Sequence, residues 1–289
     1  HVDVRCSDEI FKQLSQNYLK FRNTCKFCLD NLVGFDADHL VQPDEMLPLD
    51  KWAVTRLNTL IEKVFAAYDN YEFHVVSHMV NDFCVVDLSS FYFDIIKDRL
   101  YCGEENSLER RSAQSAVWMI LDAMTRLFAP ILAFTCDEVW LAMPHRAGDD
   151  ARNVLLNQMV QPYAAYALSE EEMGKWARLA ALRTAVNGAL EQARADKTIG
   201  KSLEAEVDLT VTAEDAFLTD MDAADLADLL IVSQVRVEVD AELTVAVRPA
   251  NGAKCLRCWK VLPTVGSDAG HPDLCPRCAA VVKNLPVIE

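Results

Sequence analysis

The chain has 289 residues, 51% of them hydrophobic, and carries 28 Lys and Arg against 44 Asp and Glu, a formal net charge of −16. This length supports a large core and two or three domains. Taken as one number, the net charge argues against a nucleic-acid binder. No apolar run is long enough to cross a bilayer, and no signal-peptide pattern opens the chain, so we expect a cytoplasmic protein without membrane contact.

The charge is distributed unevenly along the chain. Residues 173–203 carry 6 basic and 2 acidic side chains, and residues 251–289 carry 5 and 3, whereas the intervening residues 204–242 carry 1 and 12. An acidic protein meets RNA phosphates only where its positive charge is concentrated. The two basic segments are therefore the candidate RNA contacts.

Residues 1–168 predict a helical bundle. Ser7 is a predicted N-cap, and the residues after it form one apolar stripe at three-and-four spacing: Ile10, Leu14, Tyr18, Phe21, Cys25, Cys28 and Leu32. A linker at about 34–49 leads to predicted helices from residue 50, from about 72 to 101, and up to 129 before a proline. Thr135 and Glu138 predict a capping box for a short fifth helix.

Residues 169–250 predict a helix followed by a small α+β unit. Ser169 and Glu172 form a second capping box, opening a long helix to about residue 196. The period then changes to two in the runs 207–211, 235–239 and 243–247, with a helical stretch at about 217–229 between the first two. We expect a one-sided sheet.

Four cysteines near the C-terminus have the spacing of a metal site. Cys255, Cys258, Cys275 and Cys278 read C-x2-C, sixteen residues, C-x2-C, the pattern of a structural zinc site with four thiolate ligands. The turn-rich stretch between the pairs can fold back on itself. Two disulfides or four incidental core thiols are the alternatives. We predict one zinc per chain, in a module at residues 251–289.

The remaining cysteines form no paired framework, which fits reduced thiols. Cys25 and Cys28 make a third C-x2-C inside a helical pattern, and we interpret it as helix packing rather than a redox or metal site. The string KTIGKS at 197–202 lacks the earlier glycine and the strand of a phosphate-binding loop, so we expect a flexible basic loop there instead.

Trp259 follows the first cysteine pair directly. It can cover the small core of the zinc site, offer an aromatic platform for unstacked RNA bases, or do both. The local charge makes the following residues candidate RNA contacts: Arg257, Lys260, Arg277 and Lys283 in the zinc module, Arg194, Lys197 and Lys201 before it, and Arg22, Arg110 and Arg111 on the bundle.

Several strings resemble those of one enzyme family. NYLKFRNTCKFCLDNL, YEFHVVSHMVNDFCVVDLSSFYFDIIKDRLY and RRSAQSAVWMILDAMTRLFAPILAFTCDEVW are similar to the anticodon-binding bundle of class I aminoacyl-tRNA synthetases for branched aliphatic amino acids. IGKSLEA, KCLRCWKVL and HPDLCPRC narrow the resemblance to bacterial-type isoleucyl-tRNA synthetases. The resemblance covers essentially the whole chain.

The resemblance implies a ligase that charges tRNA(Ile) with isoleucine and uses ATP and magnesium. HIGH-like and KMSKS-like signatures do not occur, so we expect the catalytic and editing domains to lie in a longer polypeptide and the present chain, a monomer, to be inactive alone. This region would hold the anticodon arm. The competing hypothesis is a helical protein-interaction scaffold with a structural zinc ribbon, which the acidic composition favours.

Overall fold

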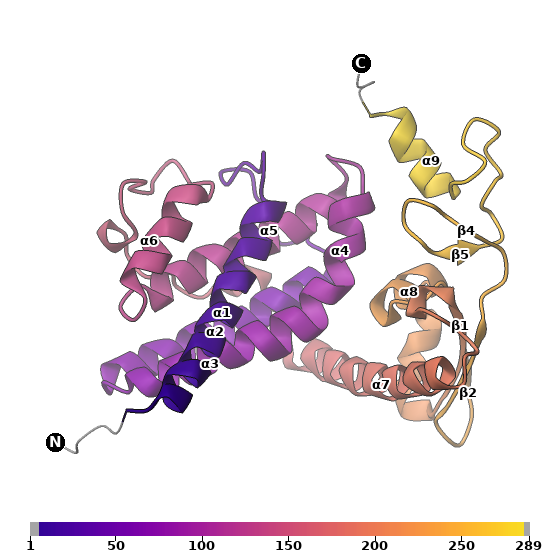
Figure 1. Cartoon of the computed structure of the whole chain (residues 1–289), viewed down its shortest axis with the longest axis horizontal. Helices are drawn as coiled ribbons and strands as arrows, with labels where there is room; N and C mark the ends of the chain where they lie inside the picture. The colour runs from indigo at the N-terminus through magenta and orange to yellow at the C-terminus, as the bar shows by residue number, and fades with distance from the viewer. Residues whose placement is uncertain (1–5, 286–289) are drawn as a thin grey trace. The chain divides into compact units, whose positions relative to one another are not determined.

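The computed structural model describes residues 6–285, which form two compact units (Figure 1). The bundle unit comprises residues up to 100 together with 105–168, and the C-terminal unit comprises 101–104 together with the residues from 169 onward. The predicted division of the C-terminal unit into an α+β part and a zinc module at residue 250 stays a prediction. None of the helices between residues 6 and 285 combines the length and apolar character needed to span a bilayer.

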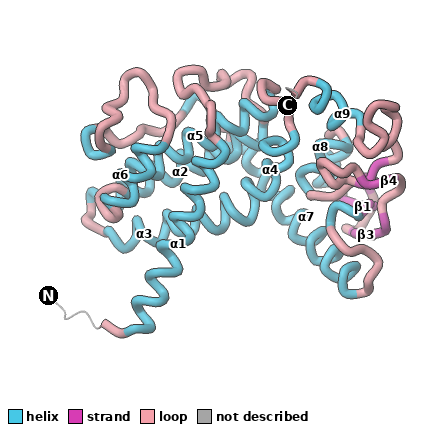
Figure 2. Tube along the Cα trace, turned by 45° about the horizontal axis from the view of Figure 1, so that its top comes forward, coloured by secondary structure: helices cyan, strands magenta, loops and turns pink. Residues whose placement is uncertain are grey.

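The regular elements of the described bundle unit are all helical, joined by long loops (Figure 2). Its helices are α1 (Asp8–Asn31), α2 (Pro48–Asp69), α3 (Phe73–Asp82), the π-helix η1 (Phe83–Tyr92), α4 (Phe93–Cys102), α5 (Leu108–Phe128) and α6 (Ala133–Ala142), with short 3-10 turns η2 (Val154–Leu156) and η3 (Ala164–Tyr166). Helix α5 lies at the centre of the core, because almost every side chain from residue 112 onward is buried.

Two helix boundaries differ from the prediction. The helix expected over 72–101 is a continuous succession of α3, η1 and α4, and the central π-helical turns could not be deduced from a 3.6-residue period. The capping box at Thr135 is wrong: α6 begins at Ala133, after Leu132, without a side-chain cap. The Thr135 hydroxyl lies 3.3 Å from that of Tyr18 instead.

The apolar stripe of α1 is buried over only half its length. Ser7 caps the helix as predicted, accepting a hydrogen bond from the Ile10 amide at 3.4 Å. Phe21, Cys25, Cys28 and Leu32 are buried, whereas Leu14 is 58% exposed. Figure 2 shows the first turns of α1 projecting beyond the rest of the bundle. The spacing of apolar residues therefore predicts the helix, but it does not predict how much of the helix packs against the bundle.

A buried carboxylate joins four elements of the bundle. Asp50 of α2 is fully buried and accepts hydrogen bonds from Tyr92 of η1 at 2.7 Å and from Ser112 of α5 at 2.5 Å. Arg99 of α4 lies 3.4 Å from the same carboxylate. Burial raises the pKa of Asp50, while the charge of Arg99 and the two hydrogen bonds oppose that shift. The network fixes the register of the helices around α5.

We expect Asp50→Ala to lower the free energy of unfolding of the bundle by about 3–5 kcal/mol, because it leaves Arg99 and two buried hydroxyls without their acceptor. Urea denaturation followed by circular dichroism measures the change. The control is Asp30→Ala, which removes a 59% exposed partner of Lys26 and should cost less than about 1 kcal/mol. Equal effects of the two substitutions would contradict the assignment.

The C-terminal unit packs one long helix and a short helix against a sheet. Helix α7 (Glu170–Ala195) begins with the predicted capping box of Ser169 and Glu172. Strands β1 (Ala205–Val211), β2 (Gln234–Val239) and β3 (Thr244–Pro249) form a sheet of order β2-β1-β3, with β1 parallel to β2 and antiparallel to β3. The 3-10 turns η4 (Ser202–Glu204) and η5 (Ala213–Asp220) and the helix α8 (Ala223–Leu230) complete this part.

The sheet has one apolar and one charged face, as predicted. Val207, Leu209 and Val211 of β1 are buried. On the other face, Glu206 accepts hydrogen bonds from Arg248 at 2.8 Å and pairs with Arg236 at 3.0 Å. The remaining elements, β4 (Ala253–Lys254), β5 (Val261–Leu262) and α9 (Pro276–Lys283), surround the four cysteines.

Candidate metal centre and the basic surface beside it

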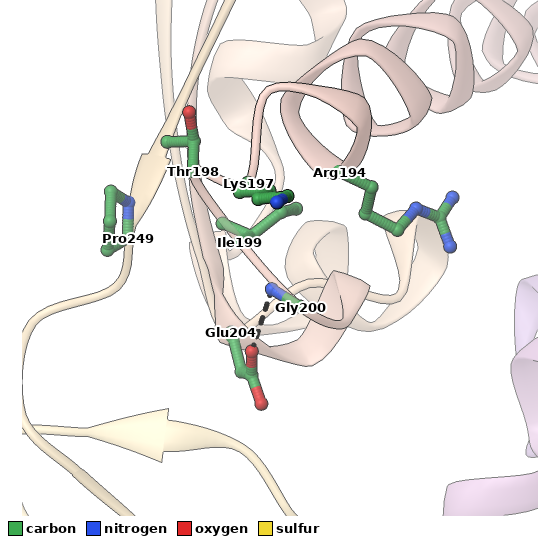
Figure 3. Close-up of a pocket in the computed structure, with 7 residues that line it drawn as sticks. All are labelled: Arg194, Lys197, Thr198, Ile199, Gly200, Glu204 and Pro249. Carbon is green, nitrogen blue, oxygen red and sulfur yellow. Dashed lines mark hydrogen bonds between the residues drawn. The ribbon is translucent and has the colours of Figure 1, made fainter.

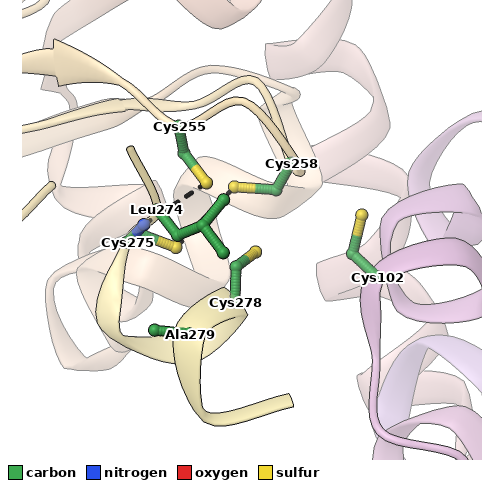
Figure 4. Close-up of a cluster of buried hydrophobic side chains, with 7 residues drawn as sticks. All are labelled: Cys102, Cys255, Cys258, Leu274, Cys275, Cys278 and Ala279. Atoms are coloured by element: carbon green, nitrogen blue, oxygen red, sulfur yellow. Dashed lines mark hydrogen bonds between the residues drawn. The ribbon is translucent and has the colours of Figure 1, made fainter. Parts of the chain in front are cut away.

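The four predicted cysteine ligands converge in the C-terminal unit. Cys255, Cys258, Cys275 and Cys278 are all buried, and their sulfur atoms lie within 4.8 Å of one another (Figure 4). The Cys258 and Cys275 sulfurs are 3.8 Å apart. Four sulfurs at about 2.3 Å from a tetrahedral zinc ion lie about 3.8 Å apart, so the cluster fits zinc. The residues present can therefore hold one ion.

Backbone hydrogen bonds shape the two ligand turns. The Cys255 amide donates to the Lys260 carbonyl and the Trp259 amide to the Cys255 carbonyl, both at 2.9 Å, which closes the first turn. Cys275 caps the N-terminus of α9, and its amide donates to the Cys255 sulfur at 3.3 Å. All ten cysteines are free, so the disulfide alternative is excluded.

The electrostatic surroundings favour the thiolate of one ligand, Cys278. A hydrogen bond with the Cys258 thiol lowers the pKa of Cys278 to about 4, and Arg257 acts in the same direction. The Arg257 guanidinium lies 3.8 Å from the Cys278 sulfur. Arg257, a predicted RNA contact, is therefore half-buried against a metal ligand.

The metal module is tied to the α+β part of its unit by polar contacts. Lys260 forms an ion pair with Asp228 of α8 and is 9% exposed. The Val261 amide donates to the Ser233 hydroxyl at 2.7 Å, and the Gln234 side chain donates to the Asn251 carbonyl at 2.7 Å. The Lys260 ammonium is thus occupied by Asp228, and we leave this predicted RNA contact out of the candidate surface.

Trp259 is exposed beside the basic loop. Its side chain is 57% exposed, and the Lys201 ammonium lies 5.7 Å from the centre of its ring. Its backbone has φ of 66°, a left-handed conformation that is costly for a residue with a bulky side chain. Of the two roles predicted from the sequence, this exposed position fits the aromatic platform better than a cover over the zinc core.

The predicted basic loop between α7 and β1 is shaped by a helix-terminating turn. Lys197 has φ of 60°, and the Thr198 amide donates to the Ala193 carbonyl at 2.9 Å, the pattern that usually places glycine at the Lys197 position. Glu204 then accepts hydrogen bonds from the Gly200 and Lys201 amides at 3.0 and 3.1 Å (Figure 3). The Glu204 carboxylate and the helix-terminating turn thus give the loop defined contacts, and its flexibility stays a prediction.

The basic loop and the zinc module, separate in sequence, form one surface. Lys201 links the loop to Trp259, and the Lys254 ammonium lies 3.8 Å from the Glu204 carboxylate. The sequence analysis missed Lys254 and Glu204. The three-residue spacing from Lys201 to Glu204, that of a capping box, was a usable signal for the glutamate.

The other candidate RNA contacts are more dispersed. Arg277 is exposed near the cysteines, and Lys283 pairs with Asp268. Arg22, Arg110 and Arg111 belong to the bundle unit, where Arg111 donates to Asn106 at 2.7 Å and to Gln114 at 3.1 Å. The C-terminal unit therefore gathers Arg194, Lys197, Lys201 and Trp259.

The third cysteine pair lies in the bundle core. Cys25 and Cys28 are buried, and burial raises the pKa of both thiols, as it does for Cys84 and Cys136. Thiols of this kind are unreactive and behave as small apolar side chains.

Comparison with known proteins identifies the class of this protein. Residues 50–209 match the model of the anticodon-binding domain of tRNA ligase, and residues 252–281 match that of the zinc finger found in FPG and IleRS. The first match covers more than half of the chain, which therefore belongs to the family of anticodon-binding domains of tRNA ligases and carries a zinc finger of that second type.

Full-length relatives are more specific. The chain is 43% identical to isoleucine–tRNA ligase of Geobacter sulfurreducens, 45% identical to that of Desulforamulus reducens and 42% identical to that of Moorella thermoacetica, over 97 to 98% of its length. It spans 31 to 32% of the length of these relatives. The resemblance deduced from the sequence strings is confirmed.

We expect Cys275→Ser to abolish zinc binding and unfold the zinc module while the bundle stays folded, because structural zinc contributes on the order of 10–16 kcal/mol of apparent binding energy. Elemental analysis of protein purified without chelator and the helical circular dichroism signal measure the two effects. Cys6→Ser, which removes an exposed thiol outside the cluster, is the control. Full zinc content in Cys275→Ser would contradict the ligand assignment.

Proposed function

We propose that this chain is the tRNA-binding C-terminal region of an isoleucine–tRNA ligase and that it holds the anticodon arm of tRNA(Ile). The observation that carries the proposal is the exposed indole of Trp259, with Lys201 beside it. Bases of single-stranded RNA stack on such rings, while neighbouring cations meet the phosphates. The matched domain and zinc-finger models support the same role.

The conformation of Trp259 adds a physical argument. A left-handed backbone costs about 1–2 kcal/mol for a residue with a side chain, and the exposed part of the indole adds no stabilising burial. The partial burial of the indole and its contact with Lys201 offset only part of this cost. A surface platform for a base explains both features.

The remaining parts of the reaction belong, in this proposal, to the longer polypeptide. Its catalytic and editing domains would bind isoleucine, ATP and magnesium. The present chain would only bind the tRNA. The zinc ion supplies a cross-link that fixes the two ligand turns. We place the protein in the cytoplasm as a monomer.

We expect Trp259→Ala to weaken binding of tRNA(Ile) by about ten-fold or more at fixed salt, because stacking on an aromatic ring contributes roughly 1–3 kcal/mol per base. Trp259→Gly should weaken binding equally while leaving the melting temperature unchanged or higher, since glycine accepts the left-handed backbone without cost. Fluorescence anisotropy with labelled tRNA and thermal denaturation measure both quantities.

A tRNA with another anticodon and the zinc content of each variant are the controls. A structural role for Trp259 predicts that the glycine variant binds tRNA like the parent. A protein-interaction scaffold predicts that the parent does not distinguish the two tRNAs. Either result would contradict the proposal.

We expect the isolated chain to show no isoleucine-dependent exchange of pyrophosphate into ATP, since neither the HIGH-like nor the KMSKS-like signature of the family occurs in its 289 residues. The standard exchange assay at high protein concentration tests this. Exchange that depends on isoleucine and persists after repurification would place catalytic residues within this chain.

A further inference from the structure

A pocket of about 420 Å³ opens on the same basic surface, and the stacking role of Trp259 does not use it (Figure 3). It is lined by Arg194 at the end of α7, the turn at 197–200, Glu204 and Pro249. Its volume falls in the range of sites for small organic ligands. Lys201 connects it to Trp259, because the Lys201 amide contacts Glu204 while the ammonium faces the indole.

Two cations line the pocket. The Arg194 guanidinium pairs with Glu191 at 2.7 Å through one terminal nitrogen. Lys197 is exposed and forms no ion pair within the described part of the chain. These groups provide positive charge that the fold itself does not fully use.

The pocket also contains one hydrogen-bond acceptor of opposite charge. The amides of Gly200 and Lys201 donate to one oxygen of Glu204 and lower the pKa of its carboxyl, which keeps it ionised. The other oxygen has only the Lys254 ammonium nearby, at 3.8 Å. Ile199 and Pro249 add apolar surface. An isolated phosphate would be repelled by Glu204, whereas a ligand with an anionic group and an N–H donor matches the whole lining.

We propose that this pocket binds one unpaired nucleotide of the RNA, adjacent to the nucleotide stacked on Trp259. Arg194 and Lys197 contact its phosphate, and Glu204 accepts a hydrogen bond from an N–H group of its base. This inference rests on the proposed function, because it requires that the surface around Trp259 binds RNA. Glu204 then contributes to base selection, whereas Arg194 and Lys197 contribute affinity without sequence preference.

The first test is Lys197→Gly, assayed in the whole zinc-bound chain against a synthetic anticodon stem–loop of tRNA(Ile). Affinity should fall about ten-fold, and the slope of log affinity against log salt should shrink by roughly one, because one charged phosphate contact is lost. The melting temperature should stay unchanged or rise, because glycine is the usual residue at this turn position. Lys175→Ala, which removes a lysine paired with Glu171 on the same helix, should change neither affinity nor slope.

The second test crosses Glu204→Gln with stem–loops that carry a single abasic nucleotide. Glutamine keeps an oxygen for the Gly200 and Lys201 amides but loses the charge. We expect one loop position at which loss of the base weakens binding to the parent but not to Glu204→Gln. Trp259→Ala should likewise make binding insensitive to loss of the base at one loop position. That position should differ from the position found with Glu204→Gln.

The outcomes separate the two proposals. If Trp259→Ala weakens binding but Lys197→Gly and Glu204→Gln bind every stem–loop like the parent, the pocket holds no nucleotide and the proposed function stands. If Trp259→Ala also binds like the parent with zinc retained, the proposed function itself is wrong.

Discussion

The convergence of four sulfur atoms is the constraint on which the C-terminal surface depends. Apart from the cysteines, the described zinc module buries few apolar side chains, among them Leu274, Ala279 and Val281. A core of this size does not stabilise a fold by itself. The metal cross-link fixes the turn from Cys255 to Lys260, and that turn alone determines where the Trp259 ring lies. Lys260 and Asp228 then attach the turn to α8.

A net charge of −16 and the proposed role in holding RNA are compatible because positive charge can still be concentrated locally, although many cations of this chain are paired with carboxylates. Lys260, Lys283 and Arg248 neutralise carboxylates of the C-terminal unit, so they do not contribute to a free basic surface. Lys197 and Lys201 remain available beside Trp259. In the proposed function, acidic faces elsewhere would repel phosphates, so RNA would be met where these cations are concentrated. The sign of the local field is therefore more informative than the total charge.

The elements and the metal site could be predicted from the sequence because both depend on local spacing. The stripe through Phe21 and Cys28, the capping box at Ser169 and the alternation in β1 each arise from periodicity or from a cap, and the cysteine spacing defines its own chemistry. The RNA surface could not be predicted fully, since it depends on tertiary contacts. Lys260 has the same local charge as Lys201, and only the position of Asp228 distinguishes a buried ion pair from a free ammonium.

Lys197 and Trp259 occupy two positions where the backbone favours glycine. A procedure that ranked sequences for this backbone by folding stability alone would replace both residues, and the product would keep its zinc, its sheet and its melting temperature. Such a protein would pass every structural assay and still have lost its partner. If the proposed function holds, stability and binding favour different residues at these two turns.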